Sequence, residues 1–214
     1  MTLKILLFSM LATLIVTLSS IPFKQIKKYE FYRACRFFLP ILALGIVIKS
    51  FIATTYIVPT SSMKPTLEKG AFVITSLLNY NINIPILDLH AFSVARPDYS
   101  DIVSFVPPNQ NKMFVKRVIG LPGDQVKYTN KTLFVNGSPI TTIPVNDDVF
   151  DVEYHGTKYQ IKIDNEYINS KAEGIWQLEH DEYFLVGDNR DHSFDSRFFG
   201  PVDGKAITGA VFSF

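Results

Sequence analysis

The sequence of 214 residues predicts a mostly β protein, in which an antiparallel β-barrel or β-sandwich catalytic domain follows two N-terminal transmembrane helices. Two apolar runs close to the N-terminus predict the helices. From residue 56 onward, short β-rich segments alternate with turns that contain proline and glycine, and this succession predicts the β domain. Charged residues make up only 19% of the chain, which excludes an intrinsically disordered protein.

The first apolar run, Ile5–Ile21, has 17 residues and no charge. It just suffices to span a bilayer core, which needs about 20 helical residues. A cleavable signal peptide is the alternative, but the end of the run before Pro22 lacks an Ala-x-Ala sequence. We therefore expect a retained transmembrane helix over residues 1–22.

The second apolar run, Phe37–Val58, is interrupted by Lys49. It spans a membrane if that lysine reaches an interface, or if the helix begins earlier, near Phe31. A buried core helix is the alternative. We expect a second transmembrane helix over residues 37–55.

Basic residues are concentrated between the two runs. This segment carries Lys24, Lys27, Lys28, Arg33 and Arg36 against Glu30 alone. Short cytoplasmic loops are enriched in Lys and Arg. Residues 23–36 are therefore expected to form a cytoplasmic loop, and residues 56–214 an extracytoplasmic domain.

The composition also excludes several function classes. Outside residues 1–49 the chain carries 14 basic and 19 acidic residues, which argues against a nucleic-acid-binding protein. The single cysteine, Cys35, excludes an intrachain disulfide and a cysteine-based zinc site. The four histidines show no metal-binding spacing. We expect no cofactor and no metal ion.

Strand and turn patterns fill the C-terminal part of the chain. Eight segments are expected to be strands: Ala71–Leu77, Asp101–Val106, Met113–Ile119, Gln125–Tyr128, Thr132–Val135, Lys158–Ile163, Tyr183–Val186 and Ala206–Phe214. Asn136-Gly137 predicts a hairpin turn between Leu133–Val135 and Ile140–Ile143. Leu121-Pro122-Gly123-Asp124 predicts a second tight turn.

Three segments hold residues that can carry chemistry, and the first is Pro59–Leu67. It places hydroxyl residues between prolines directly after the second apolar run, although taken alone it also fits a simple loop between a helix and a strand. Ser61-x-x-Lys64 matches the serine–lysine pattern of penicillin-binding proteins. That pattern needs a helix, and Pro65 argues against one.

The second segment is Phe114–Asp124. In a strand, Lys116 shares a face with the apolar Phe114 and Val118, while Arg117 points to the opposite face. Burial among apolar groups lowers the pKa of a lysine, and a neutral lysine can take a proton from a serine hydroxyl. A lysine at a sheet edge with its amine in water is the alternative.

The third segment, Gly187–Gly200, alternates opposite charges within a short loop. This composition suits a loop that is braced by its own salt bridges and holds one hydroxyl in place, and it equally suits a solvated polar loop. His192 lies between Asp191 and Asp195, so a Ser-His-Asp triad assembled from distant positions also stays open.

Behind two membrane segments and in this order, the three segments resemble the bacterial type I signal peptidases (leader peptidases), which are serine proteases with a Ser-Lys dyad. The matching blocks are Ser62-Met63-Lys64-Pro65-Thr66-Leu67, then Lys116-Arg117 with Gly120 and Pro122-Gly123-Asp124, then Gly187 to Arg197. The resemblance runs from the second membrane segment to the C-terminus. Residues from about 138 to 181 match no motif and correspond to a variable insertion.

The resemblance implies that Ser62 is the nucleophile and that Lys116 is a neutral general base. It implies an oxyanion hole made of the Ser62 backbone N–H and the Thr60 hydroxyl. Supporting roles are implied for Ser193, which would orient the lysine, and for Asp195 and Arg197, which would brace the loop. The implied substrate pockets are lined by Tyr56, Val58, Met63, Leu67, Phe114 and Val115.

The implied function is that of a membrane-bound serine endopeptidase. Such an enzyme removes N-terminal signal peptides from exported preproteins after small residues of the Ala-x-Ala type. The implied partners are these signal peptides and the lipid bilayer, with no nucleic acid and no metal. The implied location is the bacterial inner (plasma) membrane, in a multi-pass protein with its catalytic domain on the periplasmic or outer face.

Two alternatives remain. A relative could use the same dyad for pilin processing or conjugative maturation, and its narrower substrate range would distinguish it. A non-catalytic, membrane-anchored binding protein could keep the fold, but the presence of both Ser62 and Lys116 argues against this alternative.

Overall fold

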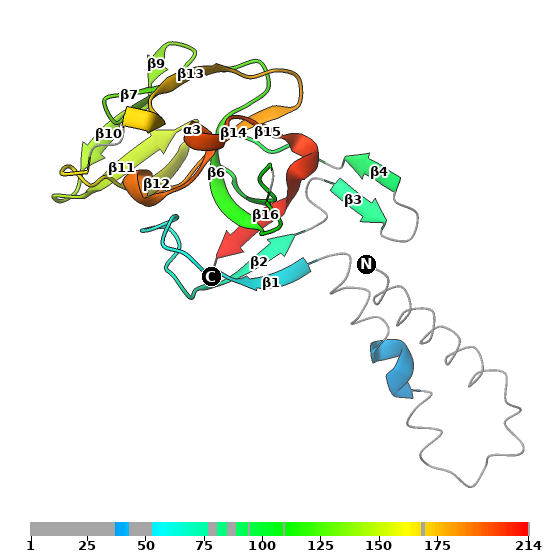
Figure 1. The fold of residues 1–214 in the computed structure, drawn as a ribbon. Coiled ribbons are helices and arrows are strands. Elements are labelled where there is room, and N and C mark those ends of the chain that lie inside the picture. The colour runs from blue at the N-terminus through cyan, green and yellow to red at the C-terminus, as the bar shows by residue number, and fades with distance from the viewer. Residues whose placement is uncertain are drawn as a thin grey trace, which may run out of the picture.

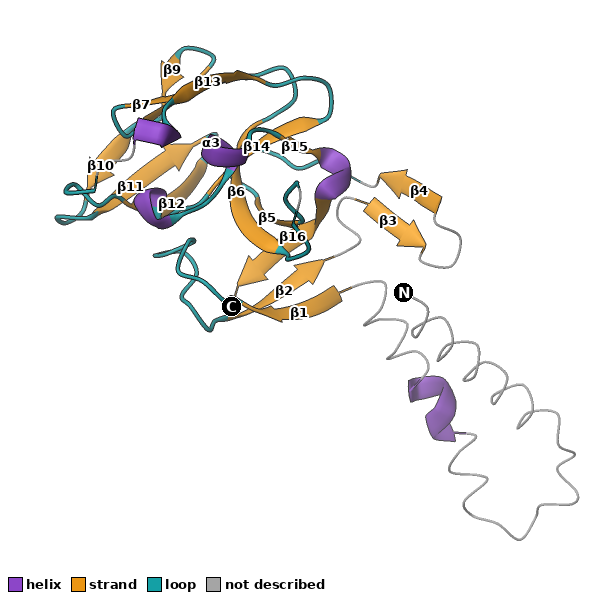
Figure 2. Ribbon diagram, viewed as in Figure 1, coloured by secondary structure: helices purple, strands orange, loops and turns teal. Residues whose placement is uncertain are grey.

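The computed structural model describes residues 37–42, 53–76, 81–84, 89–93, 95–108, 110–167 and 170–213. Strands and turns dominate this part of the chain, and the helices in it are short (Figure 2). Every pairing between two named strands is antiparallel. The expectation of a mostly β, antiparallel fold is therefore confirmed.

The largest sheet has seven strands and is open (Figure 1). Its order is β1 (Ala53–Ile57), β2 (Phe72–Ser76), β16 (Ile207–Ser213), β5 (Ile102–Phe105), β6 (Phe114–Gly120), β14 (Glu182–Val186) and β15 (Val202–Asp203). Strands β1 and β15 are its two edges, so within the described residues this sheet does not close into a barrel.

Three smaller sheets complete the β structure. The first contains β13 (Gly174–Gln177), β7 (Gln125–Thr129), β8 (Thr132–Val135) and β9 (Ser138–Pro139). The second contains β10 (Thr142–Pro144), β11 (Val149–Tyr154) and β12 (Thr157–Lys162), and the third pairs β3 (Asn81–Ile84) with β4 (Leu89–Ser93). The short helices are η1 (Ser170–Ala172), η2 (Arg190–His192), α3 (Ser196–Phe199) and η3 (Gly204–Ala206).

All eight expected strands are present, with ends within two residues of the expected ones. Asn136 and Gly137 both have positive φ angles, 51° and 79°, and form the expected two-residue turn between β8 and β9. The strand after this turn is shorter than expected. It ends at Pro139, and Ile143 belongs to β10, which pairs with β11 in a different sheet.

The boundary between the second apolar run and the β domain differs from the expectation. Residues 53–55 were expected at the end of a transmembrane helix, but they belong to β1, where Thr55 pairs with Ile74 of β2. The threonines at positions 54 and 55 favour a strand because β-branched residues suit a pleated sheet better than a helix.

The two expected membrane segments lie mostly outside the described residues. A helix is described over residues 37–42, and its side chains Phe37, Phe38, Ile41 and Leu42 are exposed. Among the described residues, no helix has both the length and the apolar character that crossing a membrane requires.

Strand β6 lies in the middle of the core and contributes to three hydrophobic clusters. Val118 packs with Val103, Phe105 and other residues of the large sheet. Ile119 belongs to a cluster that joins this sheet to the two smaller sheets built from β7–β13. Val115 packs with the residues around the β1–β2 connection. Polar side chains on β6 are therefore held in apolar surroundings.

Candidate active site

Ser62 lies in a tight turn between β1 and β2. The Lys64 backbone N–H donates to the Ser61 carbonyl at 3.2 Å, and the Leu67 N–H donates to the Met63 carbonyl at 2.9 Å. Met63 and Leu67 are buried in the cluster around the β1–β2 connection and so anchor the turn. The serine itself is 8% exposed, so it is largely shielded from solvent.

Lys116 extends from β6 to this serine. Its Nζ donates to the Ser62 Oγ at 2.7 Å and to the Val115 carbonyl at 3.0 Å. Only 3% of the residue is exposed, and Nζ lies 5.5 Å from the centre of the Phe114 ring. Within the described residues, no carboxylate forms an ion pair with this amine.

This environment changes the protonation of Lys116. Burial lowers its pKa to about 8, although the carboxylates of Asp195 and Asp188 partly oppose the shift. The Arg197 guanidinium lowers the pKa further. Because the pKa lies this close to neutrality, a substantial fraction of the amine is uncharged under mildly alkaline conditions and can accept a proton from Ser62.

Thr60 lies beside the same hydroxyl. Its Oγ1 is 3.2 Å from the Ser62 Oγ, and the residue is exposed on the surface of the turn. The oxyanion role expected for Thr60 remains a prediction.

The loop that follows β14 is hydrogen-bonded to the backbone of the serine turn. The Asn189 backbone N–H donates to the Ser62 carbonyl at 3.1 Å, and the Asn189 Nδ2 donates to the Ser61 carbonyl at 3.0 Å. Gly187 allows this close approach, because a Cβ there would lie 2.5 Å from the Ser62 carbonyl oxygen and 2.2 Å from the Ser193 Oγ. Any larger residue at position 187 would displace the serine turn.

Asp195 and Arg197 brace this loop by an ion pair, as the charge pattern suggested. The Arg197 Nε and Nη2 each donate to the Asp195 carboxylate at 2.8 Å, and Arg197 also donates to the Arg190 carbonyl. The Asp195 carboxylate also accepts from the Gly187 N–H at 3.0 Å and from the Arg197 backbone N–H at 3.3 Å. Burial alone would raise the pKa of Asp195, but Arg197 holds it below the usual value, so the carboxylate is ionised.

Ser193 lies close to this site without joining its hydrogen bonds. The residue is 6% exposed, and its Oγ has no hydrogen-bond partner among the described residues. Its hydroxyl is near enough to Asp195 to help lower the pKa of that carboxyl. The structure shows no bond between Ser193 and Lys116 among the described residues, so the orienting role expected for Ser193 remains a prediction.

The residues expected to line substrate pockets fall into two groups. Val58, Met63, Leu67 and Val115 are buried within one hydrophobic cluster, and Tyr56 packs against it. Phe114 is partly buried against the neighbouring cluster of the large sheet. All six surround the Ser62 turn or the start of β6.

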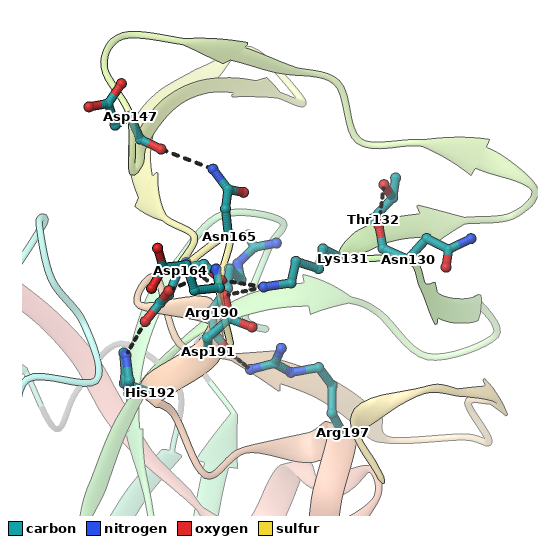
Figure 3. Close-up of polar contacts among 11 residues, drawn as sticks. Asn130, Lys131, Thr132, Asp147, Asp164, Asn165, Arg190, Asp191, His192 and Arg197 are labelled. Atoms are coloured by element: carbon teal, nitrogen blue, oxygen red, sulfur yellow. Dashed lines mark hydrogen bonds and ion pairs between the residues drawn. The ribbon is translucent and has the colours of Figure 1, made fainter. Parts of the chain in front are cut away.

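Two alternative sites are not assembled. Ser61-x-x-Lys64 lies in turns rather than on a helix, and the Lys64 amine pairs with Glu68 at 2.6 Å. Within the described residues, His192 forms no hydrogen bond with Ser62. Its Nε2 faces the Asp164 Oδ2 at 3.3 Å, on the side of β12 (Figure 3).

The sequence analysis missed a buried network on the opposite face of β6. The Arg117 Nε and Nη2 donate to the Asp188 carboxylate at 2.8 and 2.7 Å, and Thr66 also donates to Asp188. This network ties β6, the serine turn and the loop after β14 together. Two signals in the sequence could have revealed this network. Arg117 points to the face opposite Lys116, and an aspartate, Asp188, directly follows Gly187.

Comparison with known proteins gives one consistent result. The family described as "Signal peptidase, peptidase S26" matches residues 31–214. Signal peptidase I of Pseudomonas fluorescens is 32% identical, and the match covers 81% of this chain and 65% of that protein. Signal peptidase I V of Bacillus subtilis is 31% identical, over 79% of this chain and 90% of that protein.

A crystal structure of a signal peptidase I from Enterococcus faecalis is 28% identical, with a TM-score of 0.37, over 55% of this chain and 98% of that chain. The chain spans less than two thirds of the Pseudomonas fluorescens relative. Since the family match takes in most of the sequence, including Ser62 and Lys116, this chain belongs to the signal peptidase family, peptidase S26.

Proposed function

We propose that this chain is a membrane-bound serine endopeptidase, which removes N-terminal signal peptides from exported preproteins after small residues of the Ala-x-Ala type. In this proposal Ser62 is the nucleophile and Lys116 is the general base. The single observation that carries it is the 2.7 Å contact between the Ser62 Oγ and a buried lysine amine whose pKa is lowered to about 8. Family membership supports the same reaction class.

The reaction follows from this geometry. The neutral Lys116 amine takes the proton of the Ser62 hydroxyl as the oxygen attacks the carbonyl carbon of the scissile bond. The tetrahedral oxyanion is stabilised by the Ser62 backbone N–H and the Thr60 hydroxyl. The Lys116 ammonium then protonates the leaving amine, and the signal peptide stays esterified to Ser62. Lys116 next deprotonates a water molecule, which hydrolyses the ester and restores the site.

Two free strand edges suit an extended substrate. Among the described strands, β1 pairs only with β2, so its other edge is open within this part of the chain. The described pairing of β14 with β6 runs from Arg117 to Gly120 and leaves the Phe114–Lys116 part of β6 without a described partner on that side. A signal peptide that adds as a strand to these edges would place its scissile bond at Ser62. The aliphatic side chains of Val58 and Val115 would restrict the neighbouring subsites to small residues.

Exposed apolar side chains support attachment to a membrane. Ile57 and Phe72 are exposed cross-strand partners in β1 and β2, and Phe212 is exposed on the adjacent β16. Phe37 and Phe38 are exposed on the helix that starts the second apolar run. Exposed apolar groups in this number mark a lipid or protein contact. We propose two transmembrane segments, with the catalytic domain on the periplasmic or outer face of the bacterial plasma membrane.

The proposal is tested by incubating detergent-solubilised protein with several purified preproteins and sequencing the new N-termini. Cleavage after a small residue at the end of each signal peptide is expected. The Ser62→Ala variant should lose this activity, and the matched Ser61→Ala variant should retain most of it. If no preprotein is cleaved by folded protein, or if only Ser61→Ala abolishes cleavage, the proposed function or its nucleophile is wrong.

A further inference from the structure

We infer that a polar cavity next to Ser62 binds the part of the substrate that follows the scissile bond, and that it favours basic over acidic side chains there. This inference rests on the proposed function and adds a specificity site to it. The cavity has a volume of about 610 Å³, which lies within the range of about 300–1,000 Å³ found for ligand sites.

One wall of the cavity is the serine turn itself. Ser61 and Lys64 line it from that turn, and Asn189 lines it from the loop that holds the turn. Ser61 directly precedes Ser62, so a peptide whose scissile bond lies at Ser62 can continue into this cavity. Val58 and Val115, which would restrict the subsites before that bond, are not among the lining residues. The cavity is therefore assigned to the part of the substrate that follows the bond.

The opposite wall is acidic and comes from the sheet of β10, β11 and β12. Asp147 lies in the turn between β10 and β11, and Asp164 and Glu166 follow β12. Figure 3 shows how these turns meet, since the Asp147 carbonyl accepts from Asn165, which lies next to Asp164. This wall consists of loop residues that lie outside the hydrophobic core.

The charges of the cavity do not balance. Of its two lysines, Lys162 pairs with Asp148, and Lys64 pairs with Glu68, which lies outside the cavity. His192 faces Asp164. The carboxylates of Asp147 and Glu166 have no ion pair within the described part of the chain. The cavity therefore presents a surplus of negative charge to its occupant.

An unpaired acceptor gives a second, independent indication of a ligand. Asn189 is 4% exposed, and while its Nδ2 donates to the Ser61 carbonyl, its Oδ1 has no hydrogen-bond partner among the described residues. A buried amide oxygen without a donor costs free energy. Because Asn189 lines the cavity, a rotation of its amide on binding would bring this oxygen to a ligand N–H and recover that free energy. A peptide segment carries such N–H groups along its whole length, so the cavity suits an extended peptide with basic side chains.

The test uses the full chain in detergent and three peptides that differ only in the second to fourth residues after the scissile bond, which are Lys, Gln or Glu. Cleavage should be fastest for Lys and slowest for Glu. Each charge should change KM by about two- to fivefold, as expected for an exposed charge interaction, with kcat little altered. The difference should shrink at high salt. Binding of the same peptides to the Ser62→Ala variant should give the same order of affinity.

Asp147→Asn combined with Glu166→Gln should bring the three peptides to equal KM, with cleavage of the Gln peptide unchanged. Glu153→Gln combined with Glu179→Gln removes two exposed carboxylates outside the cavity and should leave the preference intact. Equal cleavage of all three peptides by the unchanged protein would overturn the inference and leave the proposed function standing. A charge preference that survives in the cavity variant would also overturn it. If folded protein cleaves none of the peptides, the proposed function fails together with this inference.

Discussion

Lys116 and Arg117 are neighbours on β6 and are equally buried, at 3% exposed each. They differ in their partners, because the two side chains point to opposite faces of the strand. Arg117 donates two hydrogen bonds to Asp188, a third to the Ser100 carbonyl, and its guanidinium lies 3.9 Å from the centre of the Tyr159 ring. Burial would lower its pKa, but Asp188 raises it. In the part of the chain that the structure describes, the hydrogen-bond partners of Lys116 are a hydroxyl and a carbonyl.

In the proposed mechanism, one strand therefore carries both a structural charge, on Arg117, and a base, on Lys116. Removing each cation from water costs free energy. Arg117 offsets this cost by its ion pair with a carboxylate, and Lys116 does not. The uncompensated cost on the other face appears as a lowered pKa of Lys116. The carboxylates of Asp195 and Asp188 raise the pKa of Lys116, but the cost of burial outweighs both.

The largest expected effect is a loss of cleavage activity when Lys116 is replaced by arginine, the residue at position 117. Lys116→Arg keeps the positive charge, but a guanidinium does not lose its proton in proteins. Cleavage of a preprotein should fall by about 10⁴-fold or more, as when a catalytic triad loses its base. The measurement is kcat/KM on purified protein with a circular dichroism spectrum like that of the unchanged protein. His192→Ala is the matched control and should keep substantial activity.

The next-largest effect is a loss of folding stability, expected when Arg117 loses its charge partner Asp188. Asp188→Asn leaves a buried guanidinium without its counter-charge, which costs about 3–5 kcal/mol of folding free energy in comparable pairs. Thermal unfolding in detergent should show a large loss of stability. Arg117→Lys keeps the charge and loses one of the two bonds to Asp188, so a smaller loss is expected, with the folded fraction still active. Unchanged stability in both variants would contradict a structural role for the Arg117–Asp188 pair.

Replacing Lys116 by methionine is expected to have a smaller effect on folding stability, and one of opposite sign: the variant should be more stable. Because its pKa is about 8 in the folded protein and about 10.5 when unfolded, the unfolded chain binds more protons between these values. The folded state therefore bears a cost that is fully present below about pH 8 and disappears as pH rises toward 10.5. At pH 7 this cost is roughly 3 kcal/mol, from the size of the shift.

Lys116→Met removes that cost but also two hydrogen bonds, so the net gain in stability at pH 7 should be about 1–3 kcal/mol. Unfolding midpoints at pH 7 and at pH 10 provide the measurement. The gain should shrink or vanish at pH 10. A variant that is less stable than the unchanged protein at pH 7, and equally so at pH 10, would mean that burial of the amine has no cost.

The sequence predicted the local features of this fold better than its long-range ones. The eight strands, the Asn136-Gly137 turn and the opposite faces of Lys116 and Arg117 follow from patterns within a few residues, and all are present. Strands such as β13 and β10 were missed because they are short and largely exposed, with little apolar alternation. The open order of the large sheet depends on pairings between distant strands, such as β16 with β2.

The same division applies to the candidate site. The pairing of Ser62 with Lys116 was predicted from the resemblance of three sequence blocks to a known family, and the structure places the two side chains 2.7 Å apart. The network of Thr66, Arg117 and Asp188 was not predicted, because each residue alone looks like an ordinary surface polar group. The acidic cavity was not predicted either, since its walls come from four segments that are distant in sequence.

The pH dependence of kcat/KM between about pH 6 and about pH 10 tests most directly whether the buried Lys116 amine is the base. Activity should rise with pH along a single ionisation with a midpoint near 8, because only the neutral amine accepts the Ser62 proton. The His192→Ala variant should give the same midpoint. A midpoint near the ordinary histidine value of about 6.5 that disappears in His192→Ala would contradict the Ser62–Lys116 dyad and favour a serine–histidine mechanism.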